Sequence, residues 1–304
     1  MAPFEKVDFV GRWRLWFAIS ALFLLASILA LALGRLNFGI DFVGGSDFTL
    51  TDLDRPASVG DVREALPADL QDDAVVQSVG DGGYEVRTPV LRQEENSAVR
   101  DALAQELGAE VSVTSFSPTF GGQIRTQALQ AVGAALAVIV LFISFRFQFA
   151  FALAAMAALV HDILITVGFY AIVGREVNLV TVVAVLTVLG YSLYDTIIIF
   201  DRIRENTPEA GYSRRRFDQM ANASVRQVIM RSIYTSVITL IPVTALLIFG
   251  ESTLSDFAFA LLVGIAAGTY SSIFIATPIL CLYKAWRARS ATSSPGRPRS
   301  AASR

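Results

Sequence analysis

The sequence predicts an α-helical membrane protein that carries one small α+β domain outside the bilayer. Of the 304 residues, 54% are hydrophobic and 17% are charged, and the mean hydropathy is +0.53, which is too apolar for a soluble domain of this length. Several runs of about 20 nearly uncharged residues have the length of a helix that crosses a bilayer. Residues 41–125 hold 16 of the 27 acidic residues but only 6 of the 25 basic ones. An acidic block therefore stands apart from a basic, apolar remainder.

Six segments have the length and composition of membrane-spanning helices. They are 13–34, 126–145, 149–173, 178–200, 229–249 and 257–283. The chain is thus expected to divide into four regions. These are an N-terminus with the first span (1–37), an extracytoplasmic α+β domain (38–125), spans two to six with a basic cytoplasmic loop at 201–228 (126–285), and a disordered basic tail (286–304).

The basic residues of the loops predict the orientation. The N-terminus, the loop 201–228 and the tail are rich in Lys and Arg, and the short link after the second span holds Arg146. Loops 174–178 and 250–256 hold one Arg between them. Basic loops stay in the cytoplasm, so both termini are expected there.

The first span admits a second interpretation, a cleavable signal peptide. Basic residues precede it, and Ala30-Leu31-Ala32 resembles a cleavage site. Its apolar stretch of about 19 residues is longer than the roughly 7–15 of a signal core, which favours an uncleaved anchor.

Residues 46–118 alternate strand and helix patterns. The order is βαββαβ, with Ser58 as a helix N-cap and Gly108 as a helix end, and this order is typical of a ferredoxin-like split sheet. The domain contains no nucleophile–base pair and no spacing typical of metal ligands, so its carboxylates are interpreted as a solvated surface. No cofactor, metal or nucleic-acid partner is expected.

The stretch GIDFVGG, residues 39–45, joins the first span to this domain. Gly39, Gly44 and Gly45 permit positive φ or a close backbone approach. The stretch, which includes Asp41, is either a flexible joint or a hinge that passes motion from the membrane to the domain.

Apart from Arg14 at the edge of the first span, four His, Asp or Arg residues lie within the predicted spans: His161, Asp162, Asp195 and Arg231. A charge at the middle of a bilayer costs at least about 2.5–3.5 kcal/mol on insertion scales, so it is rarely kept without a use. Asp195 lies about 9 Å of helix rise before Asp201, inside the predicted cytoplasmic edge. Arg231 lies early in the fifth span, which runs back in the opposite direction. We therefore expect Asp195 and Arg231 to form an ion pair that takes part in proton transport.

Structural alternatives stay open for these residues. Asp195 could belong to a purely structural salt bridge, and Arg231 could extend to the lipid headgroups. His161 could be a packed, hydrogen-bonded residue, because adjacent positions on a helix do not face each other.

Hydroxyl side chains favour a proton pathway near Asp195. Ser192 lies one turn before it, and hydroxyl groups follow one face of the fifth span at helical spacing. The latter are Ser232, Thr235, Ser236 and Thr239. Ser192 and Thr235 are therefore expected to contribute to proton transport, as are His161 and Asp162.

Small residues recur every four positions along the sixth span. They include Gly264, Gly268 and Ser272, and such a stripe lets another helix approach closely. It serves either packing within the chain or docking of a second subunit, and we expect the second.

Several motifs together resemble the SecF subunits of the bacterial SecD/SecF protein-export family. They are GIDFVGG (39–45), HDILITVGF (161–169), GYSLYDTIIIFDRIREN (190–206), RSIYTS (231–236) and FALLVGIAAGTYSSIFIA (259–276). The resemblance implies an RND-type membrane fold in a bacterial inner membrane, with Asp195 and Arg231 as the transport pair. The family usually has Asn before this Asp, whereas this chain has Tyr194.

The resemblance also implies a function and partners. The chain is expected to couple the proton-motive force to late steps of polypeptide translocation. Its expected partners are a SecD-like subunit, a SecYEG-type channel, the unfolded translocating polypeptide, protons and membrane lipids. Two alternatives stay open: half of an RND-type small-molecule exporter, and a non-transporting scaffold of the translocon. An enzyme is not expected, because the sequence has no HExxH or GxSxG motif and only one histidine.

Overall fold

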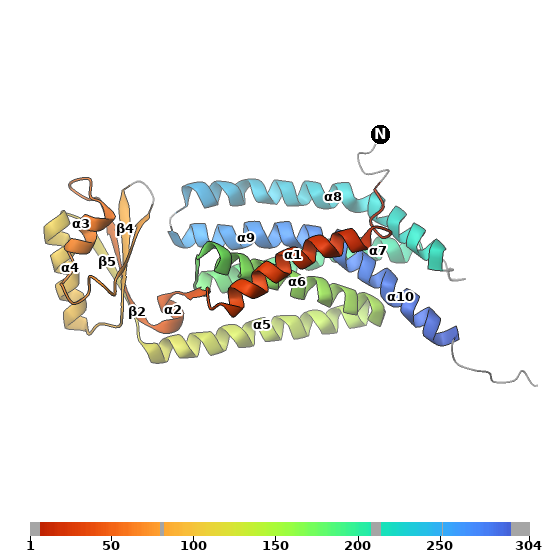
Figure 1. The fold of residues 1–304 in the computed structure, drawn as a ribbon, viewed down its shortest axis with the longest axis horizontal. Coiled ribbons are helices and arrows are strands. Elements are labelled where there is room, and N and C mark those ends of the chain that lie inside the picture. Colours follow the sequence, from red (N-terminus) through yellow and green to blue (C-terminus); the bar gives the residue numbers. More distant parts are fainter. Residues whose placement is uncertain (1–6, 80–81, 208–213, 251, 293–304) are drawn as a thin grey trace, which may run out of the picture.

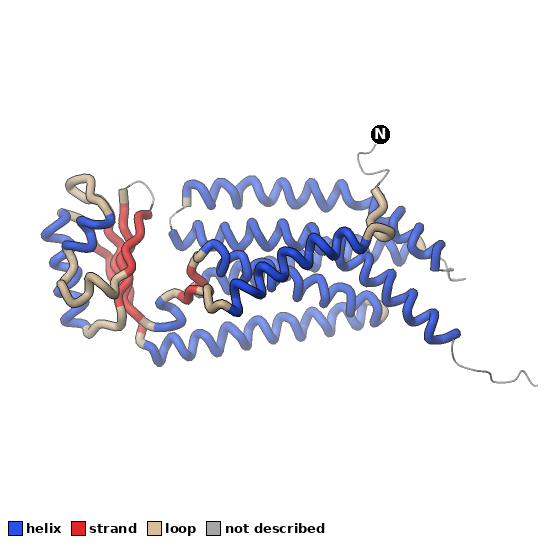
Figure 2. Tube along the Cα trace, viewed as in Figure 1, coloured by secondary structure: helices blue, strands red, loops and turns tan. Residues whose placement is uncertain are grey.

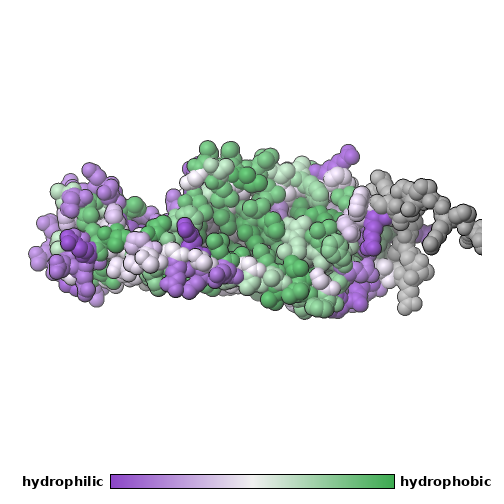
Figure 3. Space-filling model, turned by 90° about the horizontal axis from the view of Figure 1, so that it is seen from below, coloured by the Kyte–Doolittle hydropathy of each residue, from purple (hydrophilic) through white to green (hydrophobic). Residues whose placement is uncertain are grey.

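The computed structural model describes residues 7–79, 82–207, 214–250 and 252–292. It is an elongated molecule in which an α+β domain lies at one end of a bundle of long helices (Figures 1 and 2). Apolar residues cover the middle of the bundle, whereas hydrophilic residues cover the α+β domain and the opposite end of the bundle (Figure 3). This distribution is that of a protein whose middle lies in lipid.

Among the described residues, six helices are long and apolar enough to cross a membrane, as the sequence predicts. They are α1 (Trp13–Ala32), α5 (Pro118–Arg146), α6 (Phe149–Val173), α7 (Leu179–Glu205), α8 (Arg214–Phe249), and a sixth span made of α9 (Ser252–Ser271), η1 (Ser272–Ala276) and α10 (Thr277–Thr292). The chain is therefore a multi-pass membrane protein.

Several helices extend beyond the predicted spans, because hydropathy marks only their apolar part. Helix α5 begins at Pro118 rather than 126, where the Ser117 hydroxyl accepts a hydrogen bond from the amide of Phe120 as an N-cap. The predicted loop 201–228 is helical over 201–205 and 214–228, so most of it is an extension of α7 and α8. Helix α10 continues to Thr292, into the region predicted to be a disordered tail, and residues 293–304 of that tail lie outside the described residues.

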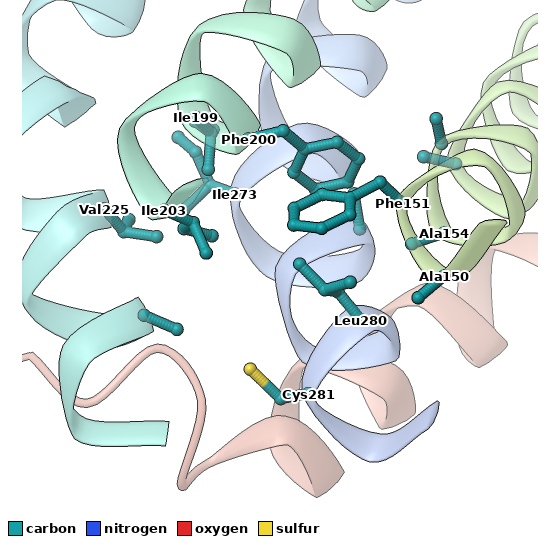
Figure 4. Close-up of a cluster of buried hydrophobic side chains, with 14 of the residues drawn as sticks. Ala150, Phe151, Ala154, Ile199, Phe200, Ile203, Val225, Ile273, Leu280 and Cys281 are labelled. Carbon is teal, nitrogen blue, oxygen red and sulfur yellow. The ribbon is translucent and has the colours of Figure 1, made fainter. Parts of the chain in front are cut away.

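Helices α6, α7 and the sixth span form the interior of the bundle, whereas α1, α5 and α8 are mostly exposed. At the end far from the α+β domain, a cluster of aromatic and aliphatic side chains joins the interior helices (Figure 4). The rings of Phe151 and Phe200 meet edge to face there with centroids 5.1 Å apart, a favourable aromatic geometry.

The sixth span widens into a π-helical turn, η1. Pro278 follows within a turn, and a proline ring clashes with the carbonyl four residues earlier in a regular α-helix. The wider turn relieves this crowding, and such turns are frequent at functional sites.

The α+β domain has the predicted order of elements. It contains β2 (Gly45–Thr51), α3 (Val59–Glu64), β3 (Val75–Val79), β4 (Gly83–Thr88), α4 (Gln93–Leu107) and β5 (Glu110–Phe116). The sheet order is β3-β4-β2-β5, and all neighbouring strands are antiparallel. Ser58 caps α3, and Gly108 ends α4 in a left-handed conformation, as predicted. Helices α3 and α4 cover the sheet face that points away from the bundle (Figure 1).

The stretch 39–45 is fixed to the bundle by hydrogen bonds. Strand β1 (Asn37–Phe38) pairs in parallel with β6 (Glu176–Val177) in the connection between α6 and α7. The short helix α2 (Ile40–Val43) follows, and the Asp41 carboxylate accepts a hydrogen bond of 3.0 Å from the amide of Leu179 at the start of α7. These contacts hold the stretch in a defined conformation, so it is not a free joint, and its role as a hinge stays a prediction.

The glycines of this stretch differ in what they permit. Gly44 has φ 82° and a Cβ there would lie 2.8 Å from the amide nitrogen of Pro118, while a Cβ on Gly45 would lie 2.8 Å from the carbonyl of Thr88. A side chain at either position would collide with backbone. Gly39 has φ −66°, which any residue adopts, so its conformation does not require glycine.

Two adjacent glycines of α5 test the contact between α2 and α5. A Cβ on Gly121 would lie 2.7 Å from the carbonyl oxygen of Phe42, whereas a Cβ on Gly122 would meet nothing within 4 Å. We expect Gly121→Ala to destabilise the protein by roughly 1–3 kcal/mol through overpacking. Gly122→Ala is expected to be neutral or to stabilise it by up to about 1 kcal/mol. Thermal unfolding of the purified variants measures both, and equal midpoints would contradict the assigned contact.

Candidate functional site

A buried carboxyl group, Asp162 on α6, lies at the centre of a hydrogen-bond network. Its side chain is 0% exposed. One carboxylate oxygen accepts hydrogen bonds from the hydroxyls of Ser192 on α7, at 2.6 Å, and Ser271 on α9, at 2.8 Å. The other lies 3.0 Å from Nδ1 of His161. The network therefore satisfies the carboxyl group from three helices.

His161 extends this network to a fourth helix. Its Nε2 atom lies 3.1 Å from the hydroxyl of Ser20 on α1. Although 161 and 162 are adjacent on α6 and were not expected to face each other, the imidazole turns back to contact the carboxylate. The structure thus brings together three of the predicted transport residues, His161, Asp162 and Ser192. It adds Ser20 and Ser271, which the sequence reasoning missed.

The predicted partner-docking stripe of the sixth span packs within the chain, so that prediction is wrong. A Cβ on Gly264 would collide with Val188 of α7, and a Cβ on Gly268 would lie 2.8 Å from Cβ of Ser192. The hydroxyl of Ser272 lies 2.8 Å from that of Thr196. The small residues do admit another helix, but this helix is α7 of the same chain, and it leaves the stripe buried.

Asp195 lies on α7 three residues after Ser192 and is 1% exposed. It stands about 24 Å of helix rise from the start of α7 at Leu179. Within the described part of the chain, neither of its carboxylate oxygens makes a hydrogen bond. The polar groups that act on it, Ser232 and Arg231, both come from α8. Asp195 is therefore a buried acid between two helices, as predicted.

The predicted ion pair between Asp195 and Arg231 is absent in this conformation. Arg231 instead donates a hydrogen bond of 3.1 Å from Nη2 to the hydroxyl of Tyr194, and the residues that the structure describes include no salt bridge between Arg231 and Asp195. The reason is directional. Tyr194 is 51% exposed on the outer side of α7, and the adjacent position, Asp195, points inward.

The hydroxyl face of α8 is only partly available to Asp195. The hydroxyl of Thr235 donates to the backbone carbonyls of Arg231 and Ser232, so it does not contact the acid. Ser236 instead meets the hydroxyl of Thr269 on α9 at 2.6 Å. Of the predicted hydroxyl groups, Ser232 is thus the one beside Asp195, while Ser192 joins Asp162.

Comparisons with known proteins show the family of this chain. The family "Protein export membrane protein SecD/SecF, C-terminal" matches residues 98–286. The chain belongs to the SecD/SecF family, in its SecF branch. It is 38% identical over 282 residues to protein translocase subunit SecF of Streptomyces coelicolor, covering 90% of this chain and 75% of that protein. It is 37% identical to the SecF of Mycobacterium tuberculosis, covering 90% of this chain and 66% of that protein.

Solved SecDF structures share the fold. The crystal structure of SecDF, a translocon-associated membrane protein from Thermus thermophilus, superposes with a TM-score of 0.81 at 33% identity, over 94% of this chain and 40% of that one. A SecDF structure in a super-membrane-facing form gives a TM-score of 0.69 at the same identity, over 96% and 40% of the two chains. The arrangement described above is thus nearer to the first of these SecDF structures.

Two hydroxyl groups of α7 test the network around Asp162. Ser192→Ala removes a donor to a fully buried carboxyl group, and we expect it to destabilise the protein by about 1–3 kcal/mol. The matched control is Thr187→Ala, whose exposed hydroxyl bonds only to the carbonyl of Val183. It should leave thermal stability almost unchanged, and an equal loss in both variants would contradict the network.

Proposed function

We propose that this chain is a proton-driven accessory subunit of the bacterial Sec translocase. It would act with a SecD-like partner and a SecYEG-type channel to promote late stages of polypeptide translocation. Membership of the SecF branch supports the role in export. The observation that carries the proton coupling is the burial of Asp195. Burying an acid inside a membrane bundle costs free energy, so such a group is rarely kept without a function.

The proposed coupling uses the change of charge at Asp195. Loss of its proton would place a negative charge between α7 and α8, and the guanidinium of Arg231 is close enough to act on that charge. Arg231 would then leave Tyr194 for Asp195, and the two helices would shift. One proton crossing about 100 mV releases about 2.3 kcal/mol, enough to change the ratio of two conformations about 50-fold.

Asp162 and His161 are proposed as a second site that binds and releases a proton. Ser192 donates to Asp162 and stands one helical turn from Asp195, so a proton passing between the two acids would pass Ser192. The hydrogen-bonded hydroxyl pairs at Thr196–Ser272 and Ser236–Thr269 lie nearby. Thr235 has no proposed part in the path, because its hydroxyl is occupied by the backbone.

The proposed orientation places the α+β domain outside the cell membrane and both termini in the cytoplasm. Arg146, Arg202, Arg204 and Arg226 lie at the bundle end far from that domain, in agreement with the preference of basic residues for the cytoplasm. We further propose that the domain is ferredoxin-like, which its βαββαβ order and antiparallel sheet support.

Asp195→Asn tests the proton site. The amide keeps the shape of the side chain but cannot release a proton, so we expect export that depends on the proton-motive force to be lost while the complex still assembles. The control is Asp201→Asn, at the bundle end, where the carboxylate pairs with Arg146 at 3.2 Å. Translocation into inverted membrane vesicles measures both. Export at the wild-type level in Asp195→Asn, or in an Asp195→Leu, Arg231→Leu double variant, would instead favour a non-transporting scaffold.

Tyr194 offers a test of the position of Arg231. Tyr194→Phe removes the hydroxyl that accepts from Arg231, so we expect proton-dependent export to fall several-fold and its pH profile to shift. Tyr194→Asn restores a carbonyl acceptor and the residue usual in the family, and should keep most of the activity. If the Phe variant exports with the wild-type rate and pH profile, the hydrogen bond has no role.

A further inference from the structure

The α+β domain meets the helical bundle across a large cavity. Its volume is about 1050 Å³, and its walls include the open face of the sheet on one side and the starts of α7 and α9 on the other. Acidic residues predominate along it. The charged side chains that line it are Asp41, Asp47, Asp52, Asp54, Arg55, Glu85, Arg87, Glu176 and Asp256.

Arg87 on β4 spans this junction. Its Nη2 atom lies 2.7 Å from Oε1 of Glu85 on the same strand, and its Nε atom lies 3.4 Å from Oδ2 of Asp47 on β2. Its remaining guanidinium nitrogen pairs with Glu176 on β6, in the connection between α6 and α7. The Arg87 side chain is 16% exposed, so one half-buried cation joins the domain to the bundle.

Glu176 is itself held firmly on the bundle. The neighbouring residue, Arg175, pairs with Asp256 of α9 at 2.6 Å. β6 also pairs with β1, and α7 begins at Leu179 directly after it. A force on Arg87 is therefore applied to the start of the helix that carries Asp195.

The charges in this cluster are unbalanced. Arg87 contacts three carboxyl groups, those of Asp47, Glu85 and Glu176, and one guanidinium cannot neutralise three buried carboxylates. Burial, followed by a hydrogen bond with Glu85, raises the pKa of Asp47 from its ordinary 3.8 to about 8. Burial also raises the pKa of Glu176, against the opposing effect of Arg87.

We propose that Arg87 couples the α+β domain to the helical bundle, and that its hold depends on a proton bound by Asp47 beside Glu85. With the proton in place, the three carboxyl groups and Arg87 carry a net charge of −1 rather than −2, and the domain stays docked. Without the proton, the carboxylates of Asp47 and Glu85 repel each other on the open face of the sheet. Arg87 is then attracted more strongly to these two carboxylates of its own domain, which weakens its pairing with Glu176. The domain would then separate from the bundle more readily.

The sign of the pH dependence follows from the raised pKa. A proton that Asp47 holds only in the docked arrangement stabilises docking fully below its ordinary pKa of 3.8, and the effect is lost as pH rises toward about 8. Within that window, the docking equilibrium should weaken by up to about tenfold per pH unit. Above pH 8 it should level off.

A distance measurement in the full chain tests the proposal. Spin labels at Ser97→Cys on the exposed side of α4 and Leu254→Cys at the start of α9, in a Cys281→Ser background, report the separation of the two parts in lipid nanodiscs. We expect a single short distance at pH 6 and a longer population that grows several-fold by pH 8. An identical distance distribution at both pH values would overturn the proposal.

Three variants test whether the distance change depends on the proton of Asp47 and on the pair between Arg87 and Glu176. Asp47→Asn should stay docked at both pH values, and a wild-type pH response in it would contradict the role of the proton. Glu176→Gln should increase the longer population at every pH, and a wild-type distribution would contradict the role of Arg87. Asp52→Asn, in the same cavity wall but outside the Arg87 cluster, should respond as wild type does.

The junction does not depend on the proposed proton path through the membrane. Asp195→Asn should therefore retain the pH-dependent distance change even where export is lost. If the wild-type protein exports normally but shows no distance change between pH 6 and pH 8, the junction proposal is wrong. The proposed transport function is unaffected by that result.

Discussion

The cost of placing a carboxyl group inside a bilayer constrains the centre of this molecule. Asp162 and Asp195 are both almost fully buried among apolar helices, but they differ in their hydrogen bonds. Asp162 has three polar neighbours from three helices, as a buried polar group requires. Asp195 has no hydrogen bond in the described part of the chain. The hydrogen bonds of the first acid are satisfied, whereas the second keeps its bonding capacity free, which suits the proton-carrying role proposed for it.

The close packing of α7 and α9 follows from the same constraint. Hydroxyl groups can serve a buried carboxylate only if the helices that carry them come within hydrogen-bonding distance. Gly264 and Gly268 permit this, because a side chain at either position would collide with α7. The stripe of small residues thus serves the polar centre rather than an outer surface. Helices α1, α5 and α8 remain mostly exposed, although α1 contributes Ser20 to the network of Asp162 and α8 brings Ser232 to Asp195.

Sequence periodicity was sufficient for the elements but not for the pairings between them. Six spans, the βαββαβ order and the burial of Asp195 follow from hydropathy and local motifs. The partner of Arg231 does not, because helical spacing fixes the angle between Tyr194 and Asp195 on α7 but not which face α8 presents to them. Ser20 and Ser271 were missed for a similar reason. A single hydroxyl in an apolar helix carries no signal until its neighbour is known. The extended ends of α5 and α8 were missed because they leave the apolar layer.

The glycine-rich stretch joins the two halves of the molecule mechanically. Helix α7 runs without interruption from Leu179 to Asp195 and beyond, and a helix resists compression along its axis because each turn is hydrogen-bonded to the next. At its start, the amide of Leu179 is bound by Asp41, and β6 just before it pairs with β1. Strand β2 of the α+β domain begins two residues after α2. A shift of α7 caused by a charge change at Asp195 would therefore reach the sheet through a short, hydrogen-bonded path. A free linker of the same length would absorb it.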